Sequence, residues 1–501
     1  MSLLVEAIDF GTTYSGWAFS FLNDFLLDPT KASVKQWYSS GTLVTEKAPT
    51  CLLIKSDGKT FEEFGYDAEN QFRELADNKM HEEFYYFIRF KMALNKKLGE
   101  KLDRGTTIED EMGKSMIALN VFAMAIEYLV GDMMKSVNDK LTNPLKKDDV
   151  HWVLTVPAIW TDAAKQFMRE AAVQAGLLTN KLTIALEPEA ASIFCRHLSV
   201  DTAISGGSLS IAKMPVGTRY MVLDAGGGTI DITVHEVVSE HSVKEIQSAS
   251  GGGWGGILVD KAFENLLIDL AGPDVYDAFK RTETEDWLDL WRDFEVKKRA
   301  VAPDKNARVG MRFPLSFSKT FKRITKGKLL GAIEASKYAS DIEFSGDKIK
   351  FSAILFKSMF EHSVGKTIKH VTSLLRDENI RKIKTILMVG GYSESSMLQH
   401  AIKKALTGQD VVIPISASCT ILIYEFQSKV VFEIFATEQC NPRYTTECSL
   451  IGKLEIDLPE PEKQPGRGII VSMTFSGTEI IVKAVDKKTG KDSSVFINFL
   501  G

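Results

Sequence analysis

Cysteine is scarce in this sequence, and long apolar runs are missing from it. The five cysteines, Cys51, Cys195, Cys419, Cys440 and Cys448, are scattered over 501 residues, and so sparse and odd a set argues against a disulfide framework. No stretch approaches the ~20 consecutive apolar residues that a membrane-spanning helix needs. The apolar start of the chain is short and lacks the basic residues of a signal peptide. These absences predict a cytoplasmic protein in a reducing compartment.

An excess of charge of either sign is also missing. The formal net charge is -5, so a large non-specific surface for nucleic acid is not expected. The basic run at 322–328 is expected to be a solvated loop. Hydrophobic residues make up 44% and charged residues 25% of the chain, a balance that is typical of globular proteins with sizeable cores. A chain of this length is expected to form three or four domain-sized units.

What the sequence does contain is a repeated strand and turn motif. Residues 7–13 (AIDFGTT) and 222–229 (VLDAGGGT) each place an apolar strand before an aspartate, a turn of small residues and a hydroxyl. Glycines let backbone N–H groups approach phosphate oxygens closely. Asp9 and Asp224 could hold Mg²⁺ through its water shell, which this ion sheds reluctantly. Taken singly, each motif is equally well an ordinary tight hairpin, but the pair predicts a grip on a polyphosphate from both sides.

Hydrophobic periodicity predicts the elements around these motifs. A third strand leads into Gly390 and Gly391 and then into a helix, whose N-terminus suits an anion or a nucleotide. Thr161 is expected to cap a helix that ends near residue 175. After about residue 424 the pattern changes to short alternating strands, which predicts a small all-β unit. The expected strands include 153–156, 384–389, 469–475, 478–485 and 493–499, a strand–turn–strand unit is expected at 219–238, and the expected long helices are 111–141 and 285–300.

These stretches resemble the two phosphate motifs and the adenosine motif of the superfamily that contains actin, sugar kinases and heat-shock ATPases. Residues 156–158 (VPA) and 186–191 (LEPEAA) narrow the resemblance to the seventy-kilodalton heat-shock proteins. Residues 9–13, 64–68 and 90–92 resemble the divergent twelve-type branch of that family. The resemblance implies an α/β fold, a two-lobed actin-like ATPase built from duplicated ribonuclease H-like domains.

The resemblance also implies how the chain is divided. Lobe I is expected at 1–198 and lobe II at 199–424, with a Ser/Gly-rich surface insertion at 199–217. A β-rich domain is expected at 425–501, because residues 468–499 are similar to the end of the family's β-type substrate-binding domain. The short join before it and the missing helical lid predict a small, truncated β-sandwich.

The ligands implied by the resemblance are ATP or ADP with Mg²⁺. Asp9 and Asp224 match the metal-side aspartates, Glu187 and Asp231 match the carboxylates beside the attacking water, and with Thr229 these form the expected catalytic set. The phosphate contacts implied are Gly11, Thr12, Thr13, Tyr14, Gly226, Gly227, Gly228 and Thr229. The adenosine contacts implied are Glu295, Lys298, Arg299, Gly390, Gly391 and Tyr392. Without the resemblance, Glu187 is better explained as a helix-capping carboxylate and 297–299 as a solvated helix face, while Tyr392 could stack on the base or cover the core.

Glu69 stands where related chaperones carry a catalytic lysine. Opposite charges 4 Å apart gain about 4 kcal/mol at an intermediate dielectric, and the reversed sign costs as much. Hydrolysis should therefore be slow unless Arg73, Arg89 or Lys91 substitutes for the lysine. Glu394 likewise stands where the family often has an arginine.

We expect an ATP-binding, slowly hydrolysing, chaperone-like protein of the heat-shock 70 kDa type. Peptide or protein clients on the C-terminal β domain and a role in stress response follow from the family alone. The alternative is a nucleotide-gated binding or scaffold protein with little or no ATP turnover, which Glu69 and the shortened tail favour. A small-molecule kinase of the same superfamily is disfavoured by the β tail and by residues 186–191.

Overall fold

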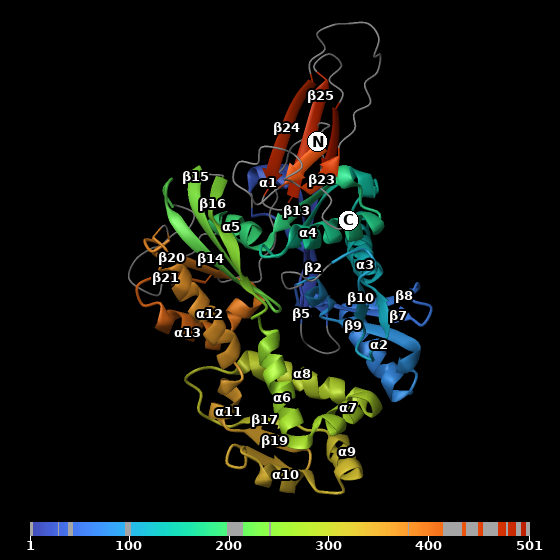
Figure 1. The fold of residues 1–501 in the computed structure, drawn as a ribbon. Helices are drawn as coiled ribbons and strands as arrows, with labels where there is room; N and C mark the ends of the chain where they lie inside the picture. The colour runs from blue at the N-terminus through green and yellow to red at the C-terminus, as the bar shows by residue number, and fades with distance from the viewer. Residues whose placement is uncertain are drawn as a thin grey trace.

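The computed structural model describes residues 4–28, 30–38, 44–95, 102–197, 214–239, 242–378 and 380–413, and the backbone of five strands between 433 and 496. The described chain is mixed α/β, with two large sheets and helices around them (Figure 1). None of its described helices combines the length and the apolar character that crossing a membrane requires. The predicted insertion at 199–217 lies mostly outside the described residues.

The first large sheet carries the first strand–turn motif. Its strand order is β13-β12-β1-β2-β3, with β6 also paired to β2. β1 runs antiparallel to β2 and parallel to β12, which is parallel to β13. The bounds are β1 Leu4–Phe10, β2 Tyr14–Phe21, β3 Ser33–Val34, β6 Ala48–Pro49, β12 Val150–Val156 and β13 Leu182–Leu186.

The second large sheet repeats this arrangement. Its order is β16-β15-β14-β20-β21, with β14 antiparallel to β15 and parallel to β20. β14 therefore occupies the place that β1 has in the first sheet, so the sequence repeat is also a repeat of topology. The bounds are β14 Arg219–Ala225, β15 Ile230–Ser239, β16 Ser242–Gly252, β20 Thr385–Val389 and β21 Asp410–Val412.

Helices pack on both sheets largely where the sequence predicts them. α4 (Asp162–Gln174) begins after Thr161, whose side chain accepts a hydrogen bond from the Ala164 N–H. α8 (Thr284–Ala300) and α3 (Ala118–Asn138) are also present. The predicted start of α3 near residue 111 was wrong, because the preceding residues form the hairpin β10 (Thr107–Glu109) and β11 (Ser115–Ile117). The other helices from residue 187 onward, apart from two between residues 315 and 335, are α5 Glu187–His197, α6 Ile257–Ala271, α7 Pro273–Thr282, α11 Ala353–Ser358, α12 Glu361–Leu374 and α13 Ser396–Ala405.

A smaller unit from the first half of the chain packs against the second half. Its sheet has the order β8-β7-β9, and α2 contacts α8. Phe72 and Tyr86 stack with ring centroids 4.1 Å apart, and both join the hydrophobic core of the second large sheet. The bounds are β7 Cys51–Lys55, β8 Phe61–Phe64, α2 Gly65–Asp77, η1 His81–Glu83, β9 Phe84–Ile88 and η2 Phe90–Leu94. This packing brings two segments far apart in sequence together beside the paired motifs.

Two further groups of strands lie at opposite ends of the molecule (Figure 1). At one end, β17 (Val309–Arg312), β18 (Ile342–Ser345) and β19 (Lys348–Phe351) form a sheet beside α9 (Leu315–Thr325) and α10 (Leu329–Ala335). The basic run at 322–328 thus begins inside α9, and its prediction as a loop was wrong there. At the other end lie β22 Glu433–Ala436, β23 Ser449–Lys453, β24 Ile469–Ser476, β25 Glu479–Asp486 and β26 Asp492–Phe496. The last three strands follow the predicted ranges closely, while the β-sandwich and the division into three domains stay predictions.

Candidate functional site

The two strand–turn motifs put their aspartates in equivalent places. Asp9 is the second-last residue of β1, and Asp224 is the second-last residue of β14. Across the antiparallel pairs, Asp9 lies opposite Gly16 and Asp224 lies opposite Asp231. Alternation along a strand fixes which face each side chain takes, so the repeat in sequence delivers one carboxylate from each sheet to the end of its strand.

The turns of the two motifs contact each other closely. A Cβ atom added to Gly227 would lie 2.3 Å from the Thr13 Oγ1 atom, and one added to Gly228 would lie 2.5 Å from the Thr12 Oγ1 atom. The Met92 Sδ atom would lie 2.4 Å from the same Cβ of Gly228. Only glycine fits at these positions, because any side chain would force the turns apart. The hydroxyls and backbone N–H groups of both motifs are therefore gathered at one place.

Four carboxylates surround this contact. Burial raises the pKa of Asp224 well above its usual range, and Glu187, Asp231 and Asp9 raise it further. Burial also raises the pKa of Asp231, whose Oδ1 atom accepts a 2.9 Å hydrogen bond from the Ile159 N–H. Like charges held close together disfavour full ionisation of the group. A cation bound here would therefore stabilise the ionised form of these carboxylates.

Glu187 is the carboxylate best suited to proton transfer. It begins α5 directly after β13, and its side chain is 20% exposed. Burial raises its pKa to about 7, against the opposing effect of the Lys91 ammonium. A base works best when its pKa lies near the working pH, so the position fits the role that the resemblance implies for it.

Two lysines supply positive charge to this cluster. Lys91, in η2, is buried with a side chain 2% exposed, and its Nζ atom lies 2.6 Å from the Glu187 Oε1 atom. The same ammonium lies 5.2 Å from the centre of the Trp160 ring. Lys47 forms an ion pair with Asp9. The sequence named Lys91 only as one of three candidates and gave no signal for Lys47.

Glu69, which stands where related chaperones carry a catalytic lysine, is paired with an arginine of α8 and not with the four carboxylates. It lies in α2 and pairs with Arg292 of α8, with the Arg292 Nη2 and Glu69 Oε2 atoms 3.3 Å apart. Arg73, a second candidate substitute, pairs with Glu285 and Asp289 of the same helix. These contacts assign Glu69 and Arg73 to the packing of α2 on α8, and leave Lys91 as the candidate beside Glu187.

Three of the residues expected at the adenosine, Glu295, Lys298 and Arg299, lie along α8. Arg299 stands over the Tyr14 ring at 5.0 Å, and its Nε atom donates to the Glu295 Oε1 atom at 2.7 Å. Although burial opposes ionisation, Lys298 and Arg299 lower the pKa of Glu295 to about 2. Lys298 also pairs at 2.6 Å with Asp260. Asp260, which the sequence did not indicate as a site residue, is held on its other side by Arg89 at 2.7 Å, so the helix face is part of an ion-pair network and not a freely solvated surface.

The third motif closes the site beside Asp224. Gly390 has φ 84, where L side chains are rare, and a Cβ there would lie 2.3 Å from the Asp224 Oδ1 atom. Gly391 begins η6 (Gly391–Glu394). Tyr392 is buried at 8% exposure among the hydrophobic residues of the second large sheet, and Gly256 lies against its ring. This burial favours the alternative that Tyr392 covers the core.

The arrangement of the carboxylates fits a magnesium ion that keeps its bound waters. Across the described part of the chain, no three His, Cys, Asp or Glu side chains converge as direct ligands of one metal ion. Mg²⁺ keeps several waters and is bound by one or two carboxylates together with phosphates. Asp9 and Asp224 come from opposite sheets and influence each other's charge, which matches that requirement.

Comparison with known proteins identifies the family of the chain. The sequence model described as "Hsp70 protein" matches residues 77–316. Human heat shock 70 kDa protein 12B is 36% identical over 473 residues, covering 84% of this chain and 67% of that protein. The chain belongs to the heat-shock 70 kDa family.

Its place within the heat-shock 70 kDa family is the type-12 branch. Human heat shock 70 kDa protein 12A is 33% identical over 472 residues, covering 84% of this chain and 68% of that protein. Chaperone protein DnaK 3 of Synechococcus sp. is 26% identical over 259 residues, or 51% of this chain and 34% of that protein. Membership makes ATP the expected ligand, because proteins of this family bind ATP on an actin-like ATPase domain.

Proposed function

We propose that this protein is a slow magnesium-dependent ATPase whose two lobes, one around each large sheet, close on the nucleotide. The observation that carries the proposal is the contact of Thr12 and Thr13 with Gly227 and Gly228. It draws together donors from both lobes at the point where the carboxylates and lysines gather. Preorganised donors and cations around a transferring phosphoryl group are what phosphoryl transfer requires.

The phosphate chain lies between the two turns in this proposal. Gly11, Thr12, Thr13 and Tyr14 contact it from one lobe, and residues 226–229 contact it from the other. Asp9 and Asp224 are the residues that would hold Mg²⁺, and the ion would neutralise phosphate charge when bound. The Tyr14 backbone sits beside Gly11, while its ring supports Arg299.

Glu187 and Asp231 orient the attacking water. Glu187 is partly ionised near neutral pH because its pKa is about 7, so it can accept a proton. Asp231 is fixed by the Ile159 N–H and holds its carboxylate in one orientation. Lys91 takes the charge role of the family lysine, because its ammonium is buried beside Glu187 while Glu69 is engaged with Arg292.

The adenosine lies against α8 and the third motif. Arg299 offers a flat guanidinium to the purine, and Glu295 and Lys298 fix its position. Gly390 and Gly391 leave room for the nucleoside beside Asp224, and Tyr392 supports them from the core. These assignments follow the family resemblance and the contacts that surround each residue.

The second candidate function is a nucleotide-gated binding protein with little turnover. The Lys91–Glu187 ion pair favours it, since a carboxylate held by a buried ammonium is a weaker base. In both candidates, the strands at 425–501 form a β-rich domain and the protein works in the cytoplasm; in the first candidate this domain holds peptide or protein clients. Chaperone activity and a stress-response role are part of the first candidate.

The dependence of ATP affinity on magnesium tests the proposed roles of Asp9 and Asp224. The double variant Asp9→Asn with Asp224→Asn should lose the tightening of ATP binding that Mg²⁺ causes, while its thermal unfolding stays cooperative. A matched control is Asp274→Asn with Asp277→Asn, which changes the charge equally at two exposed positions of α7. Titration calorimetry with and without Mg²⁺ measures the effect. Unchanged Mg-ATP affinity in the first variant would contradict the proposal that Asp9 and Asp224 bind the magnesium ion.

A further inference from the structure

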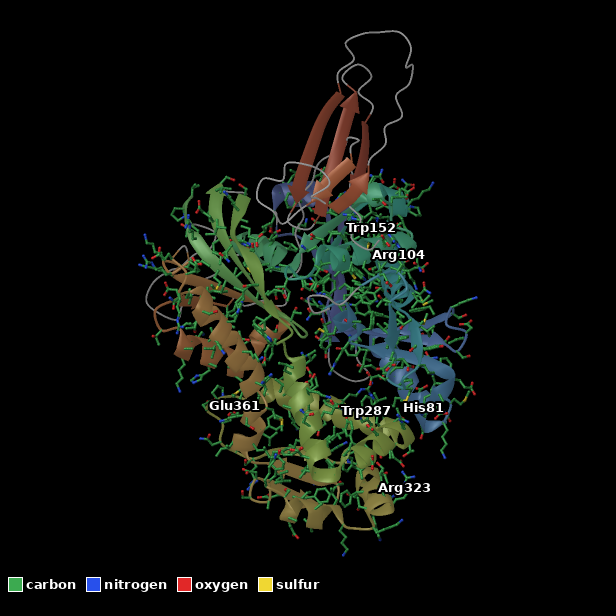
Figure 2. The ribbon with its side chains drawn as sticks, viewed as in Figure 1. His81, Arg104, Trp152, Trp287, Arg323 and Glu361 are labelled. Carbon is green, nitrogen blue, oxygen red and sulfur yellow. The ribbon has the colours of Figure 1, made fainter. Side chains whose placement is uncertain are left out.

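A basic patch lies at the end of the molecule that carries α9 and α10. We define the tip patch as Leu315, Lys319, Lys322, Arg323, Lys326, Lys328 and Leu330. All seven side chains are exposed. Figure 1 places α9 and α10 at the end opposite β24 and β25, and Figure 2 shows Arg323 there, far from Trp152. The nucleotide site makes no use of this surface.

The periodicity of α9 builds the patch. Phe317, Thr320 and Phe321 are buried and fasten one face of the helix to the core. Positions 315, 319, 322, 323 and 326 recur at spacings of one helical turn and therefore line the opposite face. α10 packs beside α9 and adds Leu330. One side of α9 is thus a structural anchor, and the other is a cationic stripe with an apolar end.

The cations of the tip patch have no acidic neighbours along the chain. Residues 305–333 hold eight Lys and Arg residues and no Asp or Glu, in a protein with a net charge of -5. The described residues give no ion pair to Lys319, Lys322, Arg323, Lys326 or Lys328. Lys326 donates to a backbone oxygen, that of Arg323, at 2.8 Å. Elsewhere on the same half of the chain Lys298 is paired twice and Arg292 once, so the unpaired cluster is a local feature.

One of these lysines stands in an unfavourable backbone conformation. Lys326 ends α9 with φ 62 and ψ 0 in the left-handed region, where glycine is the usual helix-ending residue. The next residue is Gly327, so a one-residue shift of the glycine would have removed the strain. A residue that holds a strained backbone conformation where glycine would relieve it often has a functional side chain, and here that side chain is the Lys326 ammonium.

We propose that the tip patch attaches the protein peripherally to an anionic phospholipid surface. Lys and Arg side chains are drawn to the negative charge of such a surface. Leu315, at 54% exposure, and Leu330, at 43%, enter the boundary between headgroups and acyl chains. An acidic protein would match the cations but would leave the two leucines in need of a further explanation. A bilayer accepts both kinds of side chain at once, and a convex helix face at the end of the molecule can reach it.

Vesicle sedimentation with the full chain tests the proposal. We expect binding to vesicles of equal parts phosphatidylcholine and phosphatidylserine, weak binding to phosphatidylcholine alone, and loss of binding as salt rises. The variant Lys322→Glu with Arg323→Glu should bind at least about 25-fold more weakly, since each cation contributes about fivefold. Its matched control is Lys403→Glu with Lys404→Glu, which changes the same charge in the last turn of α13 and should bind as wild type does.

Lys326→Gly separates binding from folding. It should weaken vesicle binding about fivefold and yet keep or raise the thermal midpoint, because glycine relieves the left-handed backbone. Equal binding to both vesicle types, or wild-type binding by the Lys322→Glu, Arg323→Glu variant, would overturn the proposal. The proposal would also be overturned if the protein bound polyglutamate more tightly than vesicles and Leu315→Ser left vesicle binding unchanged. That result would assign the tip patch to the binding of acidic proteins.

Discussion

Lys91→Met is the substitution that probes the site most sharply. The change removes the ammonium 2.6 Å from Glu187, which is the largest influence that lowers the pKa of that carboxyl. An opposite charge at such a distance holds a pKa down by about one to three units. Without it, the pKa of Glu187 rises above its present value of about 7.

The expected loss of activity follows from that shift. At pH 7 about half of Glu187 is ionised in the wild type, and a clearly smaller fraction is ionised in the variant. If Glu187 is the base, single-turnover hydrolysis should slow at least about fivefold at pH 7, the loss that a rise of one unit causes, and should recover in part as the pH is raised. ATP affinity should change far less, since the base acts after binding.

Pre-steady-state hydrolysis across a pH series measures this effect, with thermal unfolding recorded in parallel. Lys165→Met is the matched control, because Lys165 is also a buried lysine, 6% exposed, with an ion pair to Asp162. It should leave the pH profile in place. A Lys91→Met variant with the wild-type rate and the wild-type profile would refute the reasoning and reduce Lys91 to a packing role.

Three further changes test other parts of the account. Gly228→Ala should weaken ATP binding at least tenfold in titration calorimetry. The new Cβ would lie 2.5 Å from the Thr12 Oγ1 atom, so the two turns would have to separate. Unchanged affinity would argue against a nucleotide site formed by the contact of the two turns. Arg292→Ala removes the pairing with Glu69 and should speed release of a fluorescent ADP several-fold, as expected for one partly buried ion pair; an unchanged release rate would limit the pair to stability. His235 is buried, and burial lowers its pKa to about 4. Below about pH 6.5, the ordinary pKa of histidine, this side chain is therefore protonated in the unfolded chain but stays neutral in the native state. Stability should therefore fall by about 3 kcal/mol as the pH drops from 6.5 toward 4, and His235→Gln should flatten that part of the curve in chemical denaturation; equal slopes would contradict it.

Local patterns in the sequence predicted the frame of the site. The two Asp-and-glycine motifs became equivalent strand ends because alternation and turn chemistry act over a few residues. The cap at Thr161 was recognisable for the same reason. The start of α3 was misplaced because residues 107–117 form a hairpin, whose pairing overrides helical periodicity.

Long-range pairings could not be predicted in the same way. Glu69 and Arg292 stand 223 positions apart, and Lys91 and Glu187 stand 96 apart. Only the packing of α2 on α8, and of η2 beside α5, decides which charges meet. The family resemblance identified Glu69 as a departure, but the contacts show where its charge goes. Lys47 beside Asp9 had no signal in the sequence, since a single lysine before a short strand has no distinguishing pattern.

The central claim is that the protein hydrolyses the ATP it binds, with Glu187 acting on the water. Single-turnover hydrolysis, with protein in excess over labelled Mg-ATP and a filter assay for bound nucleotide, tests it directly. The account predicts slow conversion of bound ATP to ADP by the wild type and no conversion by Glu187→Gln, with ATP retained equally by both. Bound ATP that stays intact on the wild-type protein for hours would contradict the claim and identify a nucleotide-gated binding protein.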